Sequence, residues 1–114
     1  MIYYVDIDGT ICDQEIGRPY NLSNPFTDRI LHFNDLFDKG NEIHYYTARG
    51  SESGVDYTEL TIQQLKEWNV KYTSLSLGKP HYDIWIDDKA QNVDQYFEDE
   101  YIKDQKIVDT VVNL

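Results

Sequence analysis

The sequence of 114 residues has one cysteine, few basic residues and no long hydrophobic run. Cys12 cannot form an internal disulfide, so it fits a reducing compartment, and we expect it to be a small packing side chain. No segment approaches the roughly 18 to 20 apolar residues that span a bilayer. The opening MIYYVDIDGT has neither the basic start nor the apolar stretch of a secretion signal. We therefore expect a cytoplasmic protein that makes no membrane contact.

Positive charge is scarce, with 10 Lys and Arg against 21 Asp and Glu and a formal net charge of −11. Such a charge repels polyanions, and the sequence has no Lys/Arg cluster to offset it, so we expect no long nucleic acid as a partner. Divalent cations are favoured instead. Hydrophobic residues make up 40% of the chain, which is enough for a core, and the length predicts a single domain over residues 1–114.

Short runs of β-forming residues predict the strands of a sheet. The first runs are followed by Gly or polar residues, which is typical of buried strands that end in loops. The predicted strands cover residues 2–8, 43–47, 72–75 and 84–86, with 107–112 as a candidate for a last strand.

Amphipathic patterns between these runs predict three helices. The first has Asn24 as its N-cap and Pro25 at its first position, and it ends at Gly40. The second covers about 57–68, and the third includes 93–97. Alternating strands and helices predict an α/β fold with a parallel sheet covered on both faces and right-handed crossovers.

Polar side chains follow the predicted strands at their carboxyl ends, where open parallel sheets bind ligands. Asp6 and Asp8 are two residues apart, so both can face one site. Two unit charges about 4 Å apart repel by roughly 4 kcal/mol at an effective dielectric near 20, so clustered carboxylates need a cation, and Mg²⁺ suits such oxygen ligands. The candidate site residues are Asp6, Asp8, Thr47, Lys79, Asp87 and Asp88.

The turns that follow the first two strands supply further candidates. Gly9 lets the backbone turn closely around a ligand, and residues 10–23 predict a loop or small hairpin beside it. Arg49 follows Thr47 closely. Its planar fork of donors either clamps an anionic substrate or pairs with a surface carboxylate.

Four short motifs follow one another along the chain, namely DIDGT at 6–10, YYTAR at 45–49, GKP at 78–80 and IDDKA at 86–90. In type and order they resemble the motifs of the haloacid dehalogenase superfamily. The resemblance covers nearly the whole chain and implies a Rossmann-like fold without a cap domain.

The resemblance implies a mechanism through an aspartyl-phosphate. Asp6 would attack phosphorus, and Asp8 would protonate the leaving alcohol and later activate water. Thr47 would hydrogen-bond the phosphoryl group, and Lys79 would stabilise the nucleophile and the intermediate. The Mg²⁺ ligands would be the Asp6 carboxylate, the Asp8 backbone carbonyl and Asp87, with Asp88 as a second ligand or an orienting group.

The resemblance also bears on the substrate. In this superfamily an aspartate at the position of Asp8 goes with phosphatases and mutases, which points to a small phosphate ester. The stretch from TARG to IDDKA is similar to small phosphatases found with capsule and surface-polysaccharide genes, which implies a sugar phosphate. The candidate substrate-binding residues are Gly9, Thr10, Ala48 and Arg49.

Two other functions stay possible. The same chemistry could act on a nucleotide or a nucleic-acid end, or the chain could be a non-catalytic phosphate-binding or assembly module.

A site without a cap domain is open, so the resemblance favours a homo-oligomer in which a neighbouring subunit closes it.

Overall fold

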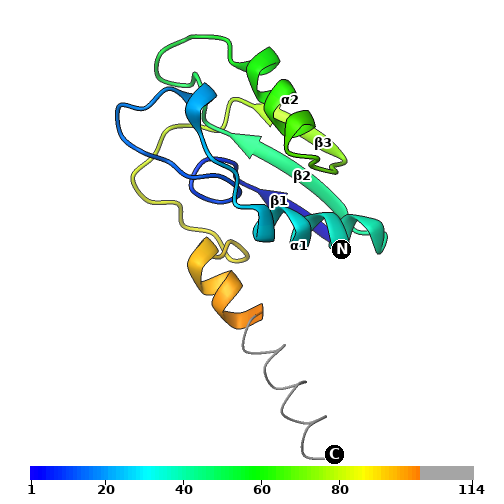
Figure 1. Cartoon of the computed structure of the whole chain (residues 1–114). Helices are drawn as coiled ribbons and strands as arrows, with labels where there is room; N and C mark the ends of the chain where they lie inside the picture. The colour runs from blue at the N-terminus through cyan, green and yellow to red at the C-terminus, as the bar shows by residue number, and fades with distance from the viewer. Residues whose placement is uncertain (101–114) are drawn as a thin grey trace, which may run out of the picture. The chain divides into compact units, whose positions relative to one another are not determined.

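The computed structural model describes residues 1–100, and the chain clusters into two compact units (Figure 1). Residues 1–82 form the first unit, and the second begins at Asp83. The first unit contains a parallel sheet of three strands in the order β1-β2-β3, namely β1 (Ile2–Val5), β2 (Glu42–Thr47) and β3 (Ser74–Leu77). These strands and their connecting helices confirm an α/β fold.

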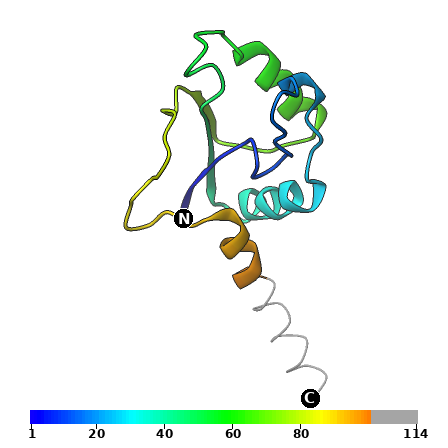
Figure 2. The same cartoon turned by 90° about the vertical axis from the view of Figure 1, so that its left-hand side faces the viewer.

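Two α-helices connect the strands, α1 (Thr27–Asp38) after β1 and α2 (Thr58–Glu67) after β2. Both helices lie on the same face of the sheet (Figure 2). The sheet grows in one direction, from β1 through β2 to β3, so crossovers of one hand put both helices on one side. In residues 1–82, helices therefore cover one face of the sheet rather than both.

The core lies between the sheet and these two helices. Alternate residues of β2 point into it, and Tyr45 is fully buried there. On the opposite face Tyr4 and His44 stack with ring centroids 4.9 Å apart. The core side chains are Val5, Ile7, Ile11, Cys12, Ile30, Phe33, Ile43, Tyr45 and Leu65. The burial of Cys12 agrees with its expected packing role.

The first helix begins later than predicted. Asn24 does not cap it, because its backbone and side-chain amides both donate to the Asp13 carboxylate at 2.9 Å. The backbone N–H of Asp13 in turn donates to the Asn24 carbonyl at 2.9 Å. Loop pairing therefore competes with capping, and α1 begins at Thr27. The predicted end holds, since Gly40 follows the C-cap with a φ of 96°.

The other boundaries agree with the prediction in part. The helix predicted over about 57–68 is α2, and the strand predicted at 43–47 is β2. The strand predicted at 72–75 is displaced toward the C-terminus, because Ser74 is the residue that aligns with His44 in the sheet register. Residues 10–23 form a loop that ends in the short 3₁₀ helix η1 (Tyr20–Leu22).

In the second unit, the strand predicted at 84–86 is not formed. Ile84 and Ile86 are 78% and 92% exposed, and no strand partner pairs with them among the described residues. An extended segment without a ladder partner is not a stable strand. Residues 93–100 are helical, which confirms the third helix, whereas the candidate strand 107–112 lies outside the described residues.

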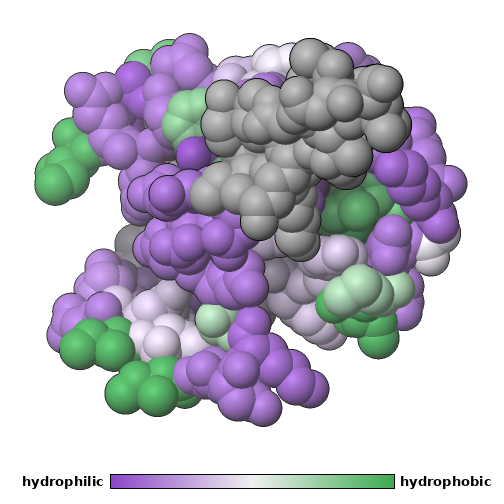
Figure 3. Space-filling model, turned by 90° about the horizontal axis from the view of Figure 1, so that it is seen from below, coloured by the Kyte–Doolittle hydropathy of each residue, from purple (hydrophilic) through white to green (hydrophobic). Residues whose placement is uncertain are grey.

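Hydrophilic residues dominate the face drawn in Figure 3, and hydrophobic residues occur there as separate patches. This distribution fits the excess of acidic residues in the sequence. Within residues 1–100, no helical stretch is long and apolar enough to cross a membrane.

Candidate functional site

Asp6 and Lys79 meet at the carboxyl edge of the sheet. Asp6 directly follows β1, and Lys79 lies two residues beyond β3. Lys79 Nζ is 3.4 Å from Asp6 Oδ1, and the Thr10 hydroxyl donates to Asp6 Oδ2 at 3.4 Å. Both contacts are long, so the Asp6 carboxylate keeps lone pairs for a ligand or a reacting atom.

Burial is the largest single influence on the pKa values of both Asp6 and Lys79. It raises the pKa of Asp6 above its ordinary value, and Lys79 offsets only part of this effect. Burial acts to lower the pKa of Lys79, but Asp6 and Tyr82 together hold that pKa above its ordinary value. The Asp6 carboxylate is therefore incompletely compensated by its protein neighbours, and a further cation beside it would be favourable.

Asp8 pairs with Arg49, the second residue after β2. Arg49 Nε donates to Asp8 Oδ2 and Nη2 donates to Asp8 Oδ1, both at 2.9 Å. This is the bidentate geometry in which a guanidinium binds a carboxylate most specifically. The Asp8 side chain is 11% exposed, and that of Arg49 is fully buried. Arg49 thus holds the Asp8 carboxylate through both of its oxygens.

Thr47 is the last residue of β2 and contacts the backbone of both Arg49 and Lys79. Its hydroxyl accepts a hydrogen bond from the backbone N–H of Arg49 at 3.2 Å. Its backbone carbonyl accepts from the backbone N–H of Lys79 at 3.1 Å, which ties the end of β2 to the segment after β3. The hydroxyl proton of Thr47 stays available for a ligand oxygen.

One cavity of about 550 Å³ brings four of the predicted site residues together. Asp6, Asp8, Thr47 and Lys79 all line it. Its remaining walls include three tyrosines and one histidine, namely Tyr20, Tyr57, Tyr82 and His81. The arrangement presents two carboxylates, a hydroxyl donor and an ammonium group to the same space.

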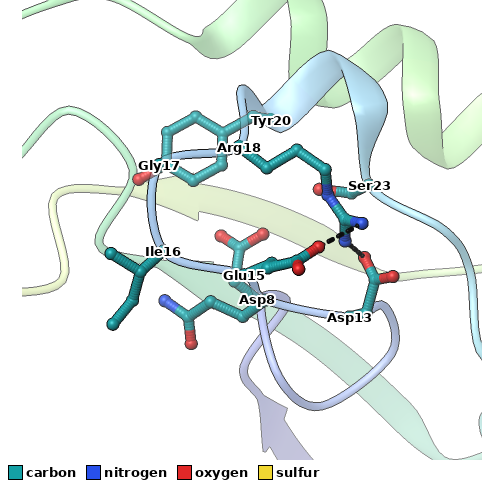
Figure 4. Close-up of a pocket in the computed structure, with 9 residues that line it drawn as sticks. Asp8, Asp13, Glu15, Ile16, Gly17, Arg18, Tyr20 and Ser23 are labelled. Carbon is teal, nitrogen blue, oxygen red and sulfur yellow. Dashed lines mark ion pairs between the residues drawn. The ribbon is translucent and has the colours of Figure 1, made fainter.

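A second cavity of about 340 Å³ is lined by the loop after β1 and shares Asp8, Gln14 and Tyr20 with the first (Figure 4). Arg18 holds this loop in place by ion pairs to Asp13 and to Glu15, with the Glu15 contact at 2.7 Å. The loop predicted from residues 10–23 therefore forms one wall of the site.

The predicted substrate-binding residues divide into two groups. Ala48 and Arg49 line the larger cavity, although the Arg49 side chain is buried. Gly9 and Thr10 do not line either cavity and instead shape the turn after β1. Gly9 has a φ of 82°, and the Thr10 backbone N–H donates to the Ile7 carbonyl at 3.1 Å.

Asp87 and Asp88 belong to the second unit and are exposed. Asp87 Oδ1 accepts backbone hydrogen bonds from Lys89 at 2.7 Å and from Ala90 at 3.1 Å, and these bonds lower the pKa of Asp87. Within residues 1–100, no group of three His, Cys, Asp or Glu side chains is arranged to hold a metal ion. Convergence of Asp87 and Asp88 with the Asp6 site stays a prediction.

Three residues of this site were not predicted from the sequence. Thr61 and Gln64 of α2 are buried and accept hydrogen bonds from Arg49 Nη1, and Tyr20 places its ring 4.7 Å from the guanidinium carbon. The available signal is the position of Thr61 and Gln64 on the same helix face as Leu65, where apolar residues are expected. Buried polar residues on such a face indicate a polar partner.

Comparison with known proteins supports the fold but adds no function. No protein-family model matches the chain, and no curated protein does. A crystal structure of a structural-genomics target from Vibrio cholerae is similar to this chain, with a TM-score of 0.73 and 25% identity over 83% of this chain and 85% of the other. The similarity agrees with a small α/β fold.

Proposed function

We propose that this protein is a Mg²⁺-dependent phosphatase of the haloacid dehalogenase type that hydrolyses a small phosphate monoester through an aspartyl-phosphate on Asp6. The observation that carries the proposal is the meeting of Asp6, Thr47 and Lys79 around one cavity at the carboxyl ends of three parallel strands. The order of the four motifs and the convergence of these three residues both support the proposal.

In the first step an Asp6 carboxylate oxygen attacks phosphorus and the bond from phosphorus to the ester oxygen breaks. Asp8 gives a proton to that oxygen, which leaves as an alcohol. Thr47 and Lys79 hydrogen-bond the phosphoryl oxygens and share their charge. In the second step water attacks the phosphorus of the aspartyl-phosphate, Asp8 takes the proton, and phosphate and the Asp6 carboxylate are released.

The residues of the site suit a magnesium ion in part. The Asp6 carboxylate has lone pairs left by its two 3.4 Å contacts. The Asp8 side chain is needed for proton transfer, so Asp8 would contribute its backbone carbonyl. Asp87 would be the next ligand, with Asp88 beside it. When bound, Mg²⁺ would neutralise negative charge on the phosphoryl oxygens.

A sugar phosphate is the substrate that the motifs favour, and a nucleotide or a nucleic-acid end is the second candidate. Tyr20, Tyr57 and Tyr82 line the cavity, and aromatic walls suit either the apolar face of a sugar ring or a base. The acidic surface disfavours a long nucleic acid. Closure of the open cavity by a second copy of the chain also stays a prediction.

The proposal is tested by phosphate release from sugar phosphates, nucleoside monophosphates and an aryl phosphate, with Mg²⁺ or with a chelator. We expect chelator-sensitive turnover that falls by at least about 10³-fold in Asp6→Asn, since the variant lacks the nucleophile. Asp28→Asn, an exposed change in the first turn of α1, is the matched control and should stay within about twofold of wild type.

Two outcomes would contradict the proposal. Turnover that persists in Asp6→Asn would remove Asp6 as the nucleophile, and the absence of turnover on every ester would favour a non-catalytic phosphate-binding module. Asp87→Asn and Asp88→Asn belong in the same assay, because the variant that needs more Mg²⁺ for half-maximal rate identifies the direct ligand.

A further inference from the structure

Arg49 is the most completely engaged polar side chain of the site. Its guanidinium has five N–H groups, and four contacts to side chains are present. Two reach Asp8 and the other two, from Nη1, reach Thr61 and Gln64. The ring of Tyr20 lies 4.7 Å from the guanidinium carbon. The side chain has no exposed surface.

A buried guanidinium is costly unless it is paired and hydrogen-bonded. Asp8 supplies the opposite charge, and α2 supplies neutral acceptors that are themselves fixed. The Thr61 hydroxyl donates to the Tyr57 carbonyl at 2.7 Å, and Gln64 Nε2 donates to the Tyr20 carbonyl at 2.5 Å. Arg49 therefore sits in a rigid socket made by α2 and by the loop after β1.

This socket leaves Arg49 little capacity to bind a substrate. Both edges of its fork are occupied, one by Asp8 and the other by α2, and no part of the side chain is open to solvent. Neither sequence hypothesis for Arg49 describes this geometry, since its carboxylate partner is a site residue and not a surface one. The contact uses one lone pair on each Asp8 oxygen, and the Cys12 thiol also donates to Oδ1 at 3.5 Å, so Oδ2 keeps a lone pair that can face the cavity.

We propose that Arg49 is a positioning residue that holds the Asp8 carboxylate in the orientation from which it exchanges a proton with the leaving group. The inference rests on the proposed phosphatase function. The inference also gives α2 a part in the reaction. Thr61 and Gln64 of α2 hold the Arg49 side chain in place, and Arg49 in turn orients the Asp8 carboxylate. A group that acts only by positioning Asp8 should slow most strongly the esters whose leaving group needs a proton from Asp8.

The test compares two esters that differ in their need for a proton donor. A 4-nitrophenyl phosphate has a stable leaving anion, whereas a benzyl phosphate releases a basic alkoxide that needs protonation. Asp8→Asn sets the reference by lowering kcat/KM, which reports the first step alone, far more for the benzyl ester than for the nitrophenyl ester. We expect Arg49→Lys, which keeps the charge but not the fork, to show the same split, by about tenfold or more.

Controls separate positioning from a general loss of structure. Gln64→Met removes one support of Arg49 and should give a smaller split in the same direction, so the inference is testable even if Arg49→Lys does not fold. Arg29→Lys is the matched control, since Arg29 contacts the Thr10 carbonyl and lines neither cavity, and its ratio between the two esters should equal that of wild type.

The outcomes are distinct. Equal losses on both esters with a raised KM in Arg49→Lys would make Arg49 a substrate-binding residue and overturn the inference. An unchanged ratio in both Arg49→Lys and Gln64→Met would overturn it as well. Wild-type protein without Mg²⁺-dependent turnover on either ester would instead overturn the proposed function, and the inference would fall with it.

Discussion

At the scale of single residues, Tyr45 has the least favourable polar environment among the described residues. It is fully buried in β2, burial raises the pKa of its phenol, and its hydroxyl has no hydrogen-bond partner within residues 1–100. A buried polar atom without a partner costs about 1–3 kcal/mol. Tyr45→Phe should therefore raise the free energy of unfolding by about that amount.

Urea denaturation of the two proteins measures this difference. The ring contact between Tyr45 and Tyr72 is kept in the variant, so the effect reports on the hydroxyl alone. Tyr46→Phe is the control, because the Tyr46 hydroxyl is only 3.5 Å from the Gly78 carbonyl in an exposed contact, and its change should stay within about 0.5 kcal/mol. A less stable Tyr45→Phe protein would show that this hydroxyl has a partner.

Residue-scale prediction from the sequence succeeds where position along a strand decides the outcome. Asp6, Thr47 and Lys79 lie at or just beyond the carboxyl ends of three strands, and parallel pairing alone brings such residues to one edge. Arg49 was recognised as a candidate, but its partners were not. Its contacts to Gln64 depend on how α2 packs on the sheet, which residue patterns do not specify.

At the scale of elements, the loop after β1 depends on Asp13. Its carboxylate accepts from the Asn24 backbone and side chain and from Arg18, and the Asn24 bonds are the main reason that its pKa is lowered to about 2. The folded state therefore holds the Asp13 proton less tightly than the unfolded chain does. The stabilisation is present above the ordinary carboxyl pKa near 4 and is lost as the pH falls toward 2.

Asp13→Asn should lower the melting temperature at neutral pH, and its difference from wild type should shrink between about pH 4 and pH 2. Thermal unfolding monitored by circular dichroism over this range measures both curves. Glu67→Gln, at the exposed end of α2, is the control and should follow wild type throughout. A difference that is constant with pH would mean that the Asp13 charge does not stabilise the loop.

The helices and strands could be predicted from the sequence where the hydrophobic periodicity is strong. The residues at which they begin and end were harder to predict. β2 and α2 agree with their patterns, but α1 starts three residues after the Asn24 that was expected to cap it, because Asn24 pairs with Asp13. The apolar triplet at 84–86 has the composition of a strand, yet a strand also requires a neighbour to pair with. The composition of this triplet does not determine whether a neighbouring strand is present to pair with it.

At the scale of the whole molecule, the net charge of −11 opposes any anionic substrate and favours Mg²⁺. Within the larger cavity, the cations Lys79 and Arg49 already contact Asp6 and Asp8. The proposed function therefore depends on a bound divalent cation to accept a phosphate group. This dependence links the acidic composition to the chemistry assigned to Asp6.

Trapping the covalent intermediate tests that chemistry most directly. The protein is mixed with an ester that it turns over and Mg²⁺, quenched, and reduced with borohydride, which converts an aspartyl-phosphate to homoserine. Peptide mass spectrometry should then find homoserine at position 6 in wild type and none in Asp6→Asn. Conversion at another aspartate, or turnover without conversion at Asp6, would contradict the account.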